Sequence, residues 1–382
     1  MENRPTTAPW GQKPTYEEWQ EKEGIPVYRD KHGIEDITLL PRRPWARMGG
    51  LGTFIELDST RDCRKEMYVA EIPPGKALEP ERHLYDELLY VLEGRGLAEV
   101  WHEGKPKVSF EWGEGSLFAI PLNAWHRLVN GSQNRVLIFA QSSAPIIMNV
   151  LRNAEFVFNC SYNFGDRFQG QGDYFTAGKA GLYKRPGGNA WDTNFVPDMR
   201  KALMGDWPEK VEGGLGSAFN MAAWTGAGVS EWPVGRYHKA HFHGPGAILL
   251  GMNSEGYVLL WPYTLGIHPY QDGHGDKVVK QPWKKNSIYS PQSGWYHHHF
   301  NTGKLPAAHF RTTGGGIGIG LPSLEQIPMG VSVRQGGRLI EHEDEDPEIR
   351  RQFAATLRAK GIEIAMKPVV YNTKPIKLAW TA

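Results

Sequence analysis

Identical residues recur in the two halves of this 382-residue chain at a nearly constant separation along the sequence. The recurring pairs are His83 and His243, Gly96 and Gly256, and Trp101 and Trp261, each 160 positions apart, and His126 and His297, 171 positions apart. The longer distance of the last pair places extra residues in a loop of the second copy. Such a repeat indicates two copies of one fold in tandem.

The residues within each copy favour short β-strands. Apolar, β-branched and aromatic runs alternate with turn residues at close intervals, which is typical of an all-β sandwich or barrel. The runs are residues 66–72, 87–101, 116–120 and 135–141 in the first copy, and 247–252, 256–261, 286–291 and 307–311 in the second. The 45 glycines and 27 prolines suit a chain with many turns better than long helices.

Helices are predicted only near the two ends of the chain. Thr15 is a candidate cap for a helix within residues 14–24, and Asp346 is one for a helix that starts at Pro347. The second helix carries a stripe of apolar residues, Ile349, Phe353 and Leu357. We interpret both helices as packing elements or as arms that clasp a neighbouring subunit.

These patterns divide the chain into five parts. The predicted parts are an N-terminal arm with a short helix at 1–45, a first barrel at 46–155, an inter-domain connection at 156–205, a second barrel at 206–330, and a C-terminal helix and tail at 331–382. The connection is polar, rich in glycine and rich in aromatic residues, and we expect its aromatic residues to order it.

Composition excludes several classes of protein. The 43 basic and 42 acidic residues nearly balance, and no basic block is present, so nucleic acid is not an expected partner. No apolar run reaches the roughly 18 residues that a membrane span needs, and the N-terminus lacks the apolar core of a signal peptide. Cys63 and Cys160 are too few for a disulfide framework, which favours the cytoplasm.

The first copy contains histidines and carboxylates at the ends of its predicted strands. Neighbouring antiparallel strands can bring His83, Glu87 and His126 together inside one barrel, and two imidazoles with one carboxylate suit Fe(II), Mn(II), Ni(II) or Zn(II). Glu81 is either a fourth ligand or a side chain turned to solvent. The alternative is that the two histidines are hydrogen-bonded inside a barrel that serves as a scaffold.

The spacing of these residues resembles that of the cupin superfamily. The first motif of that family, G-x5-H-x-H-x3-E-x6-G, is matched from Gly75 to Gly94 except that Glu81 replaces the first histidine. The second motif, G-x5-P-x-G-x2-H-x3-N, is matched from Gly115 to Asn130 except that Asn123 replaces the second glycine. The resemblance implies an all-β fold of two tandem cupin (double-stranded β-helix, or jelly-roll) barrels with short flanking helices and a metal ion in the barrel mouth.

The second copy keeps the histidines of the motif and loses the carboxylate. His241 and His243 are two apart on a strand and therefore share a face, and His297 follows a proline–glycine turn. Ala247 aligns with Glu87, and Lys285 stands where the second motif begins with glycine, so that turn must differ. The predicted ligands are therefore three histidines, with a solvated histidine-rich loop as the alternative.

Other residues of the second copy are candidates for supporting or catalytic roles. Strand alternation turns His299 to the same side as His297 and turns His298 away, and it places His309 and Arg311 on one face. His299 is a candidate supporting group or substitute ligand, whereas His238 is expected outside the ligand set. His309 and Arg311 either bind a substrate carboxylate or act as an acid–base pair, unless Arg311 is a structural ion-pair partner.

A site of three neutral ligands leaves the metal ion its full charge and favours a chelating, anionic substrate beside O2. In this respect the chain resembles the thiol, diketone and gentisate-type dioxygenases of the cupin superfamily. The resemblance implies a dioxygenase that depends on a divalent metal, with Fe(II) favoured over Mn, Ni or Zn, and that cleaves a small anionic aromatic or diketone-like molecule. The alternatives are a non-redox lyase, decarboxylase or isomerase, and a bicupin that binds a ligand without turnover. We also expect a homo-oligomer, most simply a dimer.

Overall fold

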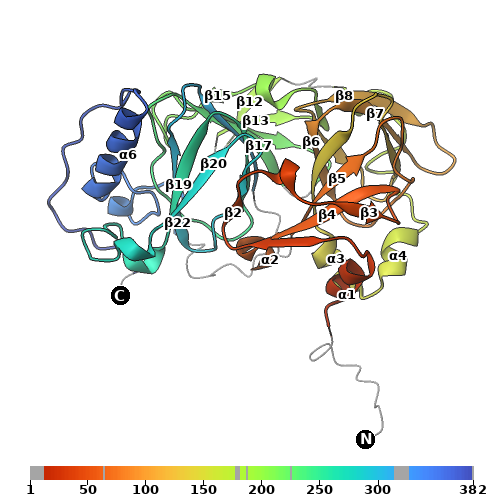
Figure 1. The fold of residues 1–382 in the computed structure, drawn as a ribbon, viewed down its shortest axis with the longest axis horizontal. Helices are drawn as coiled ribbons and strands as arrows, with labels where there is room; N and C mark the ends of the chain where they lie inside the picture. Colours follow the sequence, from red (N-terminus) through yellow and green to blue (C-terminus); the bar gives the residue numbers. More distant parts are fainter. Residues whose placement is uncertain are drawn as a thin grey trace, which may run out of the picture.

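The strands form two barrels that lie side by side along the long axis of the molecule (Figure 1). The structure is a computed structural model, and it describes residues 13–62, 65–176, 181–185, 188–223, 226–313 and 327–380. Each barrel consists of one large sheet and one three-stranded sheet.

The first barrel is built mainly from residues of the first copy. Its large sheet has the spatial order β1 (Val27–Asp30), β4 (Gly50–Leu57), β5 (Glu66–Ile72), β11 (Val136–Ser142), β6 (Glu87–Glu93), β9 (Leu117–Ile120) and β14 (Phe195–Val196), with β3 (Arg43–Trp45) paired to β4. Its small sheet has the order β10 (Trp125–Val129), β7 (Arg95–Trp101) and β8 (Val108–Gly113).

The second barrel repeats this arrangement. Its large sheet has the order β12 (Leu182–Arg185), β13 (Gly188–Asp192), β16 (Leu215–Asn220), β17 (Gly226–Trp232), β23 (Ala307–Thr313), β18 (Ile248–Asn253), β21 (Ile288–Tyr289) and β2 (Gly33–Ile34), with β15 (Gly205–Asp206) paired to β16. Its small sheet has the order β20 (Val279–Lys284), β19 (Glu255–Pro262) and β22 (Trp295–Asn301).

The predicted all-β class of two tandem barrels is confirmed, and the eight predicted runs all contain strands. The run 87–101 is two strands, because Gly94 adopts a positive φ of 88° between β6 and β7. The segment predicted as a connection supplies β12 and β13 to the second sheet and β14 to the first, so it is built into both barrels.

The two halves exchange short strands. β2, from the first half, pairs with β21 of the second barrel, and β14, from the second half, pairs with β9 of the first barrel. A one-turn 3-10 helix follows each exchanged strand, η1 (Ile37–Leu39) and η2 (Met199–Lys201), and the side chains of Asp36 and Asp198 cap these helices in the same way. The interface within the chain is therefore nearly symmetric.

Apolar residues from both large sheets form one shared core between the barrels. Tyr90 of β6 stacks on Phe310 of β23, with ring centroids 5.3 Å apart, and Leu88, Leu250 and Ile248 are buried in the same cluster. Because burial of such surface stabilises by roughly 25 cal/mol per Å², this core holds the barrels together as one unit.

The helices pack on the outside of the barrels. α1 (Thr15–Lys22), α3 (Ala144–Leu151) and α4 (Ala154–Asn159) lie together beside the first barrel, α2 (Asp58–Asp62) follows β4, and α6 (Pro347–Ala359) covers the far end of the second barrel (Figure 1). The other short helices among the described residues are η3 (Tyr263–Leu265), η4 (Gly275–Lys277) and η5 (Val333–Gln335).

The structure corrects one predicted cap and confirms the other. Thr15 is the first helical residue of α1 and the residue before it is Pro14, which has no side-chain donor or acceptor, so the predicted Thr15 cap does not form. Asp346 accepts a hydrogen bond from the backbone N–H of Glu348, as predicted, and the stripe Ile349, Phe353 and Leu357 is buried. The apolar faces of both helices are therefore packed against other parts of the same chain.

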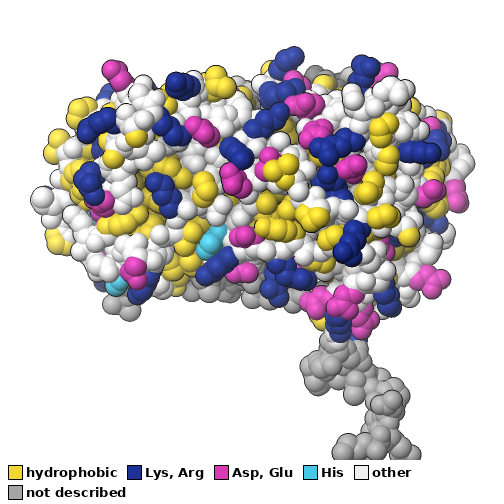
Figure 2. Space-filling view, viewed as in Figure 1, with side chains coloured by type: hydrophobic (Ala, Val, Ile, Leu, Met, Phe, Trp, Pro, Cys, Tyr) yellow, Lys and Arg dark blue, Asp and Glu magenta, His cyan; other side chains and the backbone are white. Residues whose placement is uncertain are grey.

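The surface carries mixed charge. On the face shown in Figure 2, Lys and Arg side chains alternate with Asp and Glu, and no large area has a single sign. Among the described residues, no helix combines the length and the apolar character needed to cross a bilayer.

Candidate metal centres and substrate cavity

Three histidines meet inside the second barrel. His297 lies on β22, and His241 forms an isolated antiparallel bridge with it from the neighbouring segment. The Nε2 atoms of these two residues are 3.2 Å apart, and the ring of His243 lies 4.5 Å from that of His297. One ligand atom from each residue lies within 4.8 Å of the others. The predicted set is therefore brought together.

Backbone carbonyls fix the tautomer of all three rings. The Nδ1 atoms of His241, His243 and His297 lie 3.2, 2.7 and 3.2 Å from the carbonyl oxygens of Lys239, Gly244 and Trp295, respectively. Since a carbonyl can only accept, each Nδ1 carries the hydrogen and each Nε2 keeps its lone pair for a metal ion.

Burial also keeps these imidazoles neutral. It lowers the pKa of His241 and His297 well below the ordinary value of 6.5 and lowers the pKa of His243 to about 4. Neutral imidazoles with converging lone pairs are the donors that divalent first-row metals bind. The residues present therefore fit a divalent metal ion.

The three histidines line a cavity of about 250 Å³. The other residues that line it include aromatic, basic and small polar ones, among them Trp207, Trp232, Ser217 and Ser230. Because sites for drug-sized ligands typically enclose roughly 300–1,000 Å³, this cavity suits a smaller molecule.

Two cations, the buried Lys210 and the half-buried Arg311, face this cavity without an acidic partner. Lys210, which is 4 % exposed, has no hydrogen-bond partner for its Nζ among the described residues, and burial followed by the charges of Lys239 and Arg311 lowers its pKa to about 7. No Asp or Glu is among the described residues that line the cavity. The electrostatics of the site therefore favour an anion.

Arg311 contacts two neighbouring residues and still has an N–H group without a hydrogen-bond partner among the described residues. Its Nη2 donates to the carbonyl of Ser217 at 3.3 Å and its guanidinium lies 5.2 Å from the ring centroid of Trp207. Its Nε has no partner in the described part of the chain, and burial lowers its pKa to about 10. The structure shows no carboxylate in contact with Arg311, so the alternative of a structural ion pair has no support among the described residues.

The remaining candidates lie where strand alternation predicts. His299 and His309 line the cavity, and Tyr289 Oη lies 2.9 Å from Nδ1 of His299. His309 is fully buried, neither of its ring nitrogens has a hydrogen-bond partner among the described residues, and burial lowers its pKa to about 3. His238 also faces the cavity without being part of the ligand set, and His298 lies on the opposite face of β22.

The first barrel brings together its own three candidate ligands. His83 Nε2 lies 3.5 Å from Glu87 Oε2, and His126 Nε2 lies 3.9 Å from the same oxygen. The Nδ1 atoms of both histidines face carbonyl oxygens, those of Tyr85 and Ala124. Burial opposes the protonation of His83, but the hydrogen bond and charge of Glu87 outweigh it and raise the pKa of His83. This set also fits a divalent metal ion.

Glu81 is not turned to solvent, and its role as a fourth ligand stays a prediction. One of its oxygens forms an ion pair with Arg47, and the other lies 3.8 Å from Nε2 of His126. Glu81 therefore faces the candidate ligands while the half-buried guanidinium of Arg47 holds it. The cavity at this site is only about 10 Å³, close to the minimum for a single water, so it has no room for a substrate.

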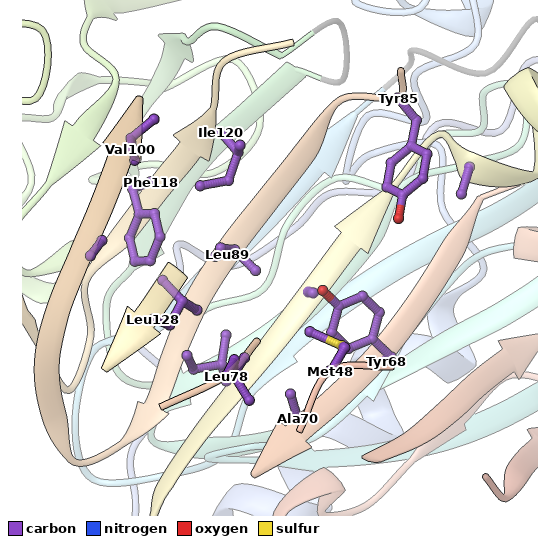
Figure 3. Packing of buried hydrophobic residues seen from close by; sticks show 14 of the residues in the cluster. Met48, Tyr68, Ala70, Leu78, Tyr85, Leu89, Val100, Phe118, Ile120 and Leu128 are labelled. Atoms are coloured by element: carbon purple, nitrogen blue, oxygen red, sulfur yellow. The ribbon is translucent and has the colours of Figure 1, made fainter. Parts of the chain in front are cut away.

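Equivalent positions of the two barrels show why their interiors differ. Residues at matching register are apolar in the first barrel and polar in the second: Leu78 and His238, Leu128 and His299, Ile138 and His309, Ala140 and Arg311. Figure 3 shows Leu78, Leu128 and Ala70 filling the first interior, where Ser230 replaces Ala70 in the second. The first barrel is thus packed, and the second encloses a polar cavity.

Comparison of the two copies would have revealed this difference from the sequence, because each polar residue replaces an apolar one at a repeat distance of 160 or 171. Lys210 and Trp207 gave no such signal, because they lie in the loop between β15 and β16 and reach the cavity only through the fold.

Turn residues support the equivalence of the two motifs. Asn123, which replaces a motif glycine, adopts a positive φ of 58°, and its counterpart Gly294 has a φ of 71°. Asparagine is one of the few residues that tolerate this conformation. In the second barrel the turn that Lys285 was expected to alter is made by Asn286, with a φ of 66°.

The asparagines that end the two motifs make the same contacts. Nδ2 of Asn130 donates to the carbonyls of Ile72, Pro73 and Asn134, and Nδ2 of Asn301 faces those of Trp232, Pro233 and Leu305. Each asparagine thus joins the end of its motif to the end of an earlier strand, β5 in the first barrel and β17 in the second.

Comparison with known proteins agrees with this assignment. Residues 68–140 match the family model described as a cupin domain. The chain therefore contains a cupin domain at residues 68–140 and a second barrel that repeats its strand arrangement. It carries a packed first barrel with two histidines and a carboxylate, and an open second barrel with three histidines.

The solved structures that match the chain at low identity include two oxalate decarboxylases. An oxalate decarboxylase from Bacillus subtilis is 12 % identical, with a TM-score of 0.47 and coverage of 78 % of this chain and 82 % of that one. An oxalate decarboxylase from Lactobacillus farciminis, in complex with formate, is 12 % identical, with a TM-score of 0.47 and coverage of 78 % and 91 %. No curated protein matches the chain.

Proposed function

We propose that this bicupin is a metal-dependent enzyme that binds a small carboxylate in the second barrel and transfers a proton to or from it without net oxidation. The observation that carries the proposal is the meeting, in one cavity, of three metal-binding imidazoles with the side chains of Lys210 and Arg311 and with no acidic residue among the described lining. Decarboxylation, elimination and isomerisation are the reactions of this class.

The positive groups define the substrate. A divalent ion at His241, His243 and His297 would act as a Lewis acid on a carboxylate and an oxygen next to it. Arg311 has a free Nε and can bind a second anionic group with two parallel hydrogen bonds. A 2-oxo or 2-hydroxy acid with a further carboxylate, or a phenolic acid, meets both requirements within about 250 Å³.

Lys210 is the candidate proton donor or acceptor. A general acid or base works best when its pKa lies near the working pH, and that of Lys210 is about 7. The amine has no partner in the described structure that would compete for its proton. A bound anionic substrate raises the pKa of Lys210, so the amine takes a proton from water and can donate it to the reacting carbon.

The test is turnover in D2O by the metal-loaded protein, followed by NMR, with small 2-oxo, 2-hydroxy, β-keto and phenolic acids as substrates. We expect release of CO2 or exchange of a carbon-bound proton, no consumption of O2, and loss of turnover in Lys210→Met. Lys284→Met is the matched control, because Lys284 is at the surface and pairs with Glu35. Full turnover by Lys210→Met would contradict the role of Lys210.

A dioxygenase that uses Fe(II) is the second candidate. The observation in its favour is that three ligands leave coordination room for a chelating substrate together with O2, and that the cavity is lined by aromatic side chains. Oxygen uptake in proportion to substrate consumed would select this candidate over the first. Binding without any turnover would instead support a ligand-binding role.

A further inference from the structure

A third group of potential metal ligands lies behind the second barrel. His298 is on β22 between two residues that face the cavity, and its own side chain is on the opposite face. His342 and Glu345 come from the segment that precedes α6. One ligand atom from each of the three residues lies within 4.8 Å of the others.

The distances within this group match those of a tetrahedral ion. Glu345 Oε2 lies 3.7 Å from His298 Nε2 and 3.2 Å from His342 Nδ1. Ligands bound at about 2.1 Å and at the tetrahedral angle lie about 3.4 Å from one another. The two measured distances lie on either side of that value, as do those of the cupin ligands.

Protein groups alone do not satisfy this cluster. His298 is fully buried, and neither of its ring nitrogens has a hydrogen-bond partner among the described residues. The carboxylate of Glu345, 2 % exposed, accepts from the phenol of Tyr237 and from His342. A buried imidazole without a partner costs about 1–3 kcal/mol, which an ion bound to its lone pair would remove.

We propose that His298, His342 and Glu345 form a structural Zn²⁺ site, separate from both cupin sites, that fastens the segment before α6 to β22. Two imidazoles and one carboxylate in near-tetrahedral arrangement are ligands that Zn²⁺ accepts, with water as the fourth. None of the three residues lines the 250 Å³ cavity. The ion joins α6, whose Phe353 packs on Tyr237 and Phe300, to the wall of the barrel.

The experiment measures Zn²⁺ per chain in the full-length protein after loading and desalting, together with the Zn²⁺-dependent rise in melting temperature. We expect His342→Ala to lose about one ion per chain and most of that rise, and the double variant His297→Ala/His342→Ala to lose one ion more than His297→Ala alone. The matched control is His274→Ala, since His274 belongs to none of the three ligand groups.

A folded His342→Ala that retains the ion content and the Zn²⁺-dependent stabilisation of the parent would overturn the proposal. If His342→Ala does not fold, Glu345→Gln decides, because the amide keeps the shape of the side chain and an acceptor for Tyr237 but is a poor ligand. Loss of one ion by Glu345→Gln supports the site, and unchanged content overturns it.

Discussion

Gly228 lies directly opposite Arg311 across the paired strands β17 and β23. A Cβ atom at Gly228 would lie 2.5 Å from the carbonyl oxygen of Ser217 and 3.1 Å from the guanidinium carbon of Arg311. The equivalent pair in the first barrel is Tyr68 and Ala140, where the tyrosine bonds Glu87. The missing side chain at Gly228 thus makes the space that the arginine occupies.

We therefore expect Gly228→Ala to displace Arg311 and weaken the binding of anionic ligands about tenfold, with unchanged metal content. The added methyl also meets backbone, so a loss of about 1–3 kcal/mol in unfolding free energy is expected. Titration calorimetry and denaturation measure the two effects. Gly113→Ala is the control, because its Cβ would contact nothing within 4 Å. Equal ligand affinity in parent and Gly228→Ala would contradict this relationship.

Arg311→Lys tests the contact with substrate directly. Lysine keeps the charge but cannot make two parallel hydrogen bonds, so we expect KM to rise about tenfold, which corresponds to about 1.4 kcal/mol, while metal content stays intact. Steady-state kinetics and metal analysis give the two readouts. If the variant binds and turns over substrate like the parent, Arg311 is a structural residue.

Metal content should differ between the two barrels. The second barrel presents three neutral imidazoles to an open cavity, whereas in the first barrel Arg47 competes for Glu81 beside the ligands. We expect His297→Ala to remove one ion per chain and the cupin sites together to hold between one and two ions. Mass spectrometry of the desalted protein measures the number of ions per chain. A third ion, bound by the group of His298, would be identified by its loss in His342→Ala. Unchanged metal content in His297→Ala would show that the second-barrel assignment is wrong.

The buried amine of Lys210 should lower the free energy of unfolding of the protein. Its pKa is about 7 in the folded protein and about 10.5 in the unfolded chain, so the unfolded state binds more protons between these values. The penalty is complete below pH 7, shrinks as pH rises, and is lost above about 10.5. Because each tenfold loss of proton affinity corresponds to about 1.4 kcal/mol, we expect Lys210→Met to stabilise the protein by a few kcal/mol at pH 6.5 and by much less at pH 10.

Urea denaturation at both pH values measures the effect of Lys210→Met, with Lys284→Met as the surface control. A Lys210→Met variant that is no more stable than the parent at pH 6.5 would show that the amine is not buried as a charge.

A homo-oligomer stays a prediction, and the structure locates a surface for it. α1 and α6 pack within the chain, but α3 and α4 expose Val150, Leu151 and Phe156, at 70, 42 and 49 %. We expect light scattering at micromolar concentration to show a dimer and Phe156→Glu to dissociate it, because a buried charge opposes an apolar contact. A monomeric parent would remove this prediction.

The sequence alone determined the two barrels, their order and the grouping of six candidate metal ligands. Strand alternation, the repeat distance and the motif spacing are local properties, and they place residues such as His241, His243 and His297 on one side of neighbouring strands whatever the rest of the chain does. The same alternation correctly placed His309 and Arg311 at the cavity and His298 away from it. The helix stripe from Ile349 to Leu357 was predictable for the same reason.

Only the tertiary structure decided what surrounds those ligands. Lys210 reaches the cavity from a loop that has no repeating sequence pattern. Glu81 forms an ion pair with Arg47, 34 residues away in the sequence. The strands β2 and β14 pair with strands of the opposite barrel. Each of these depends on contacts between segments distant in sequence, which no local pattern encodes. The group of His298, His342 and Glu345 is of the same kind, because it exists only where the C-terminal segment folds back onto β22.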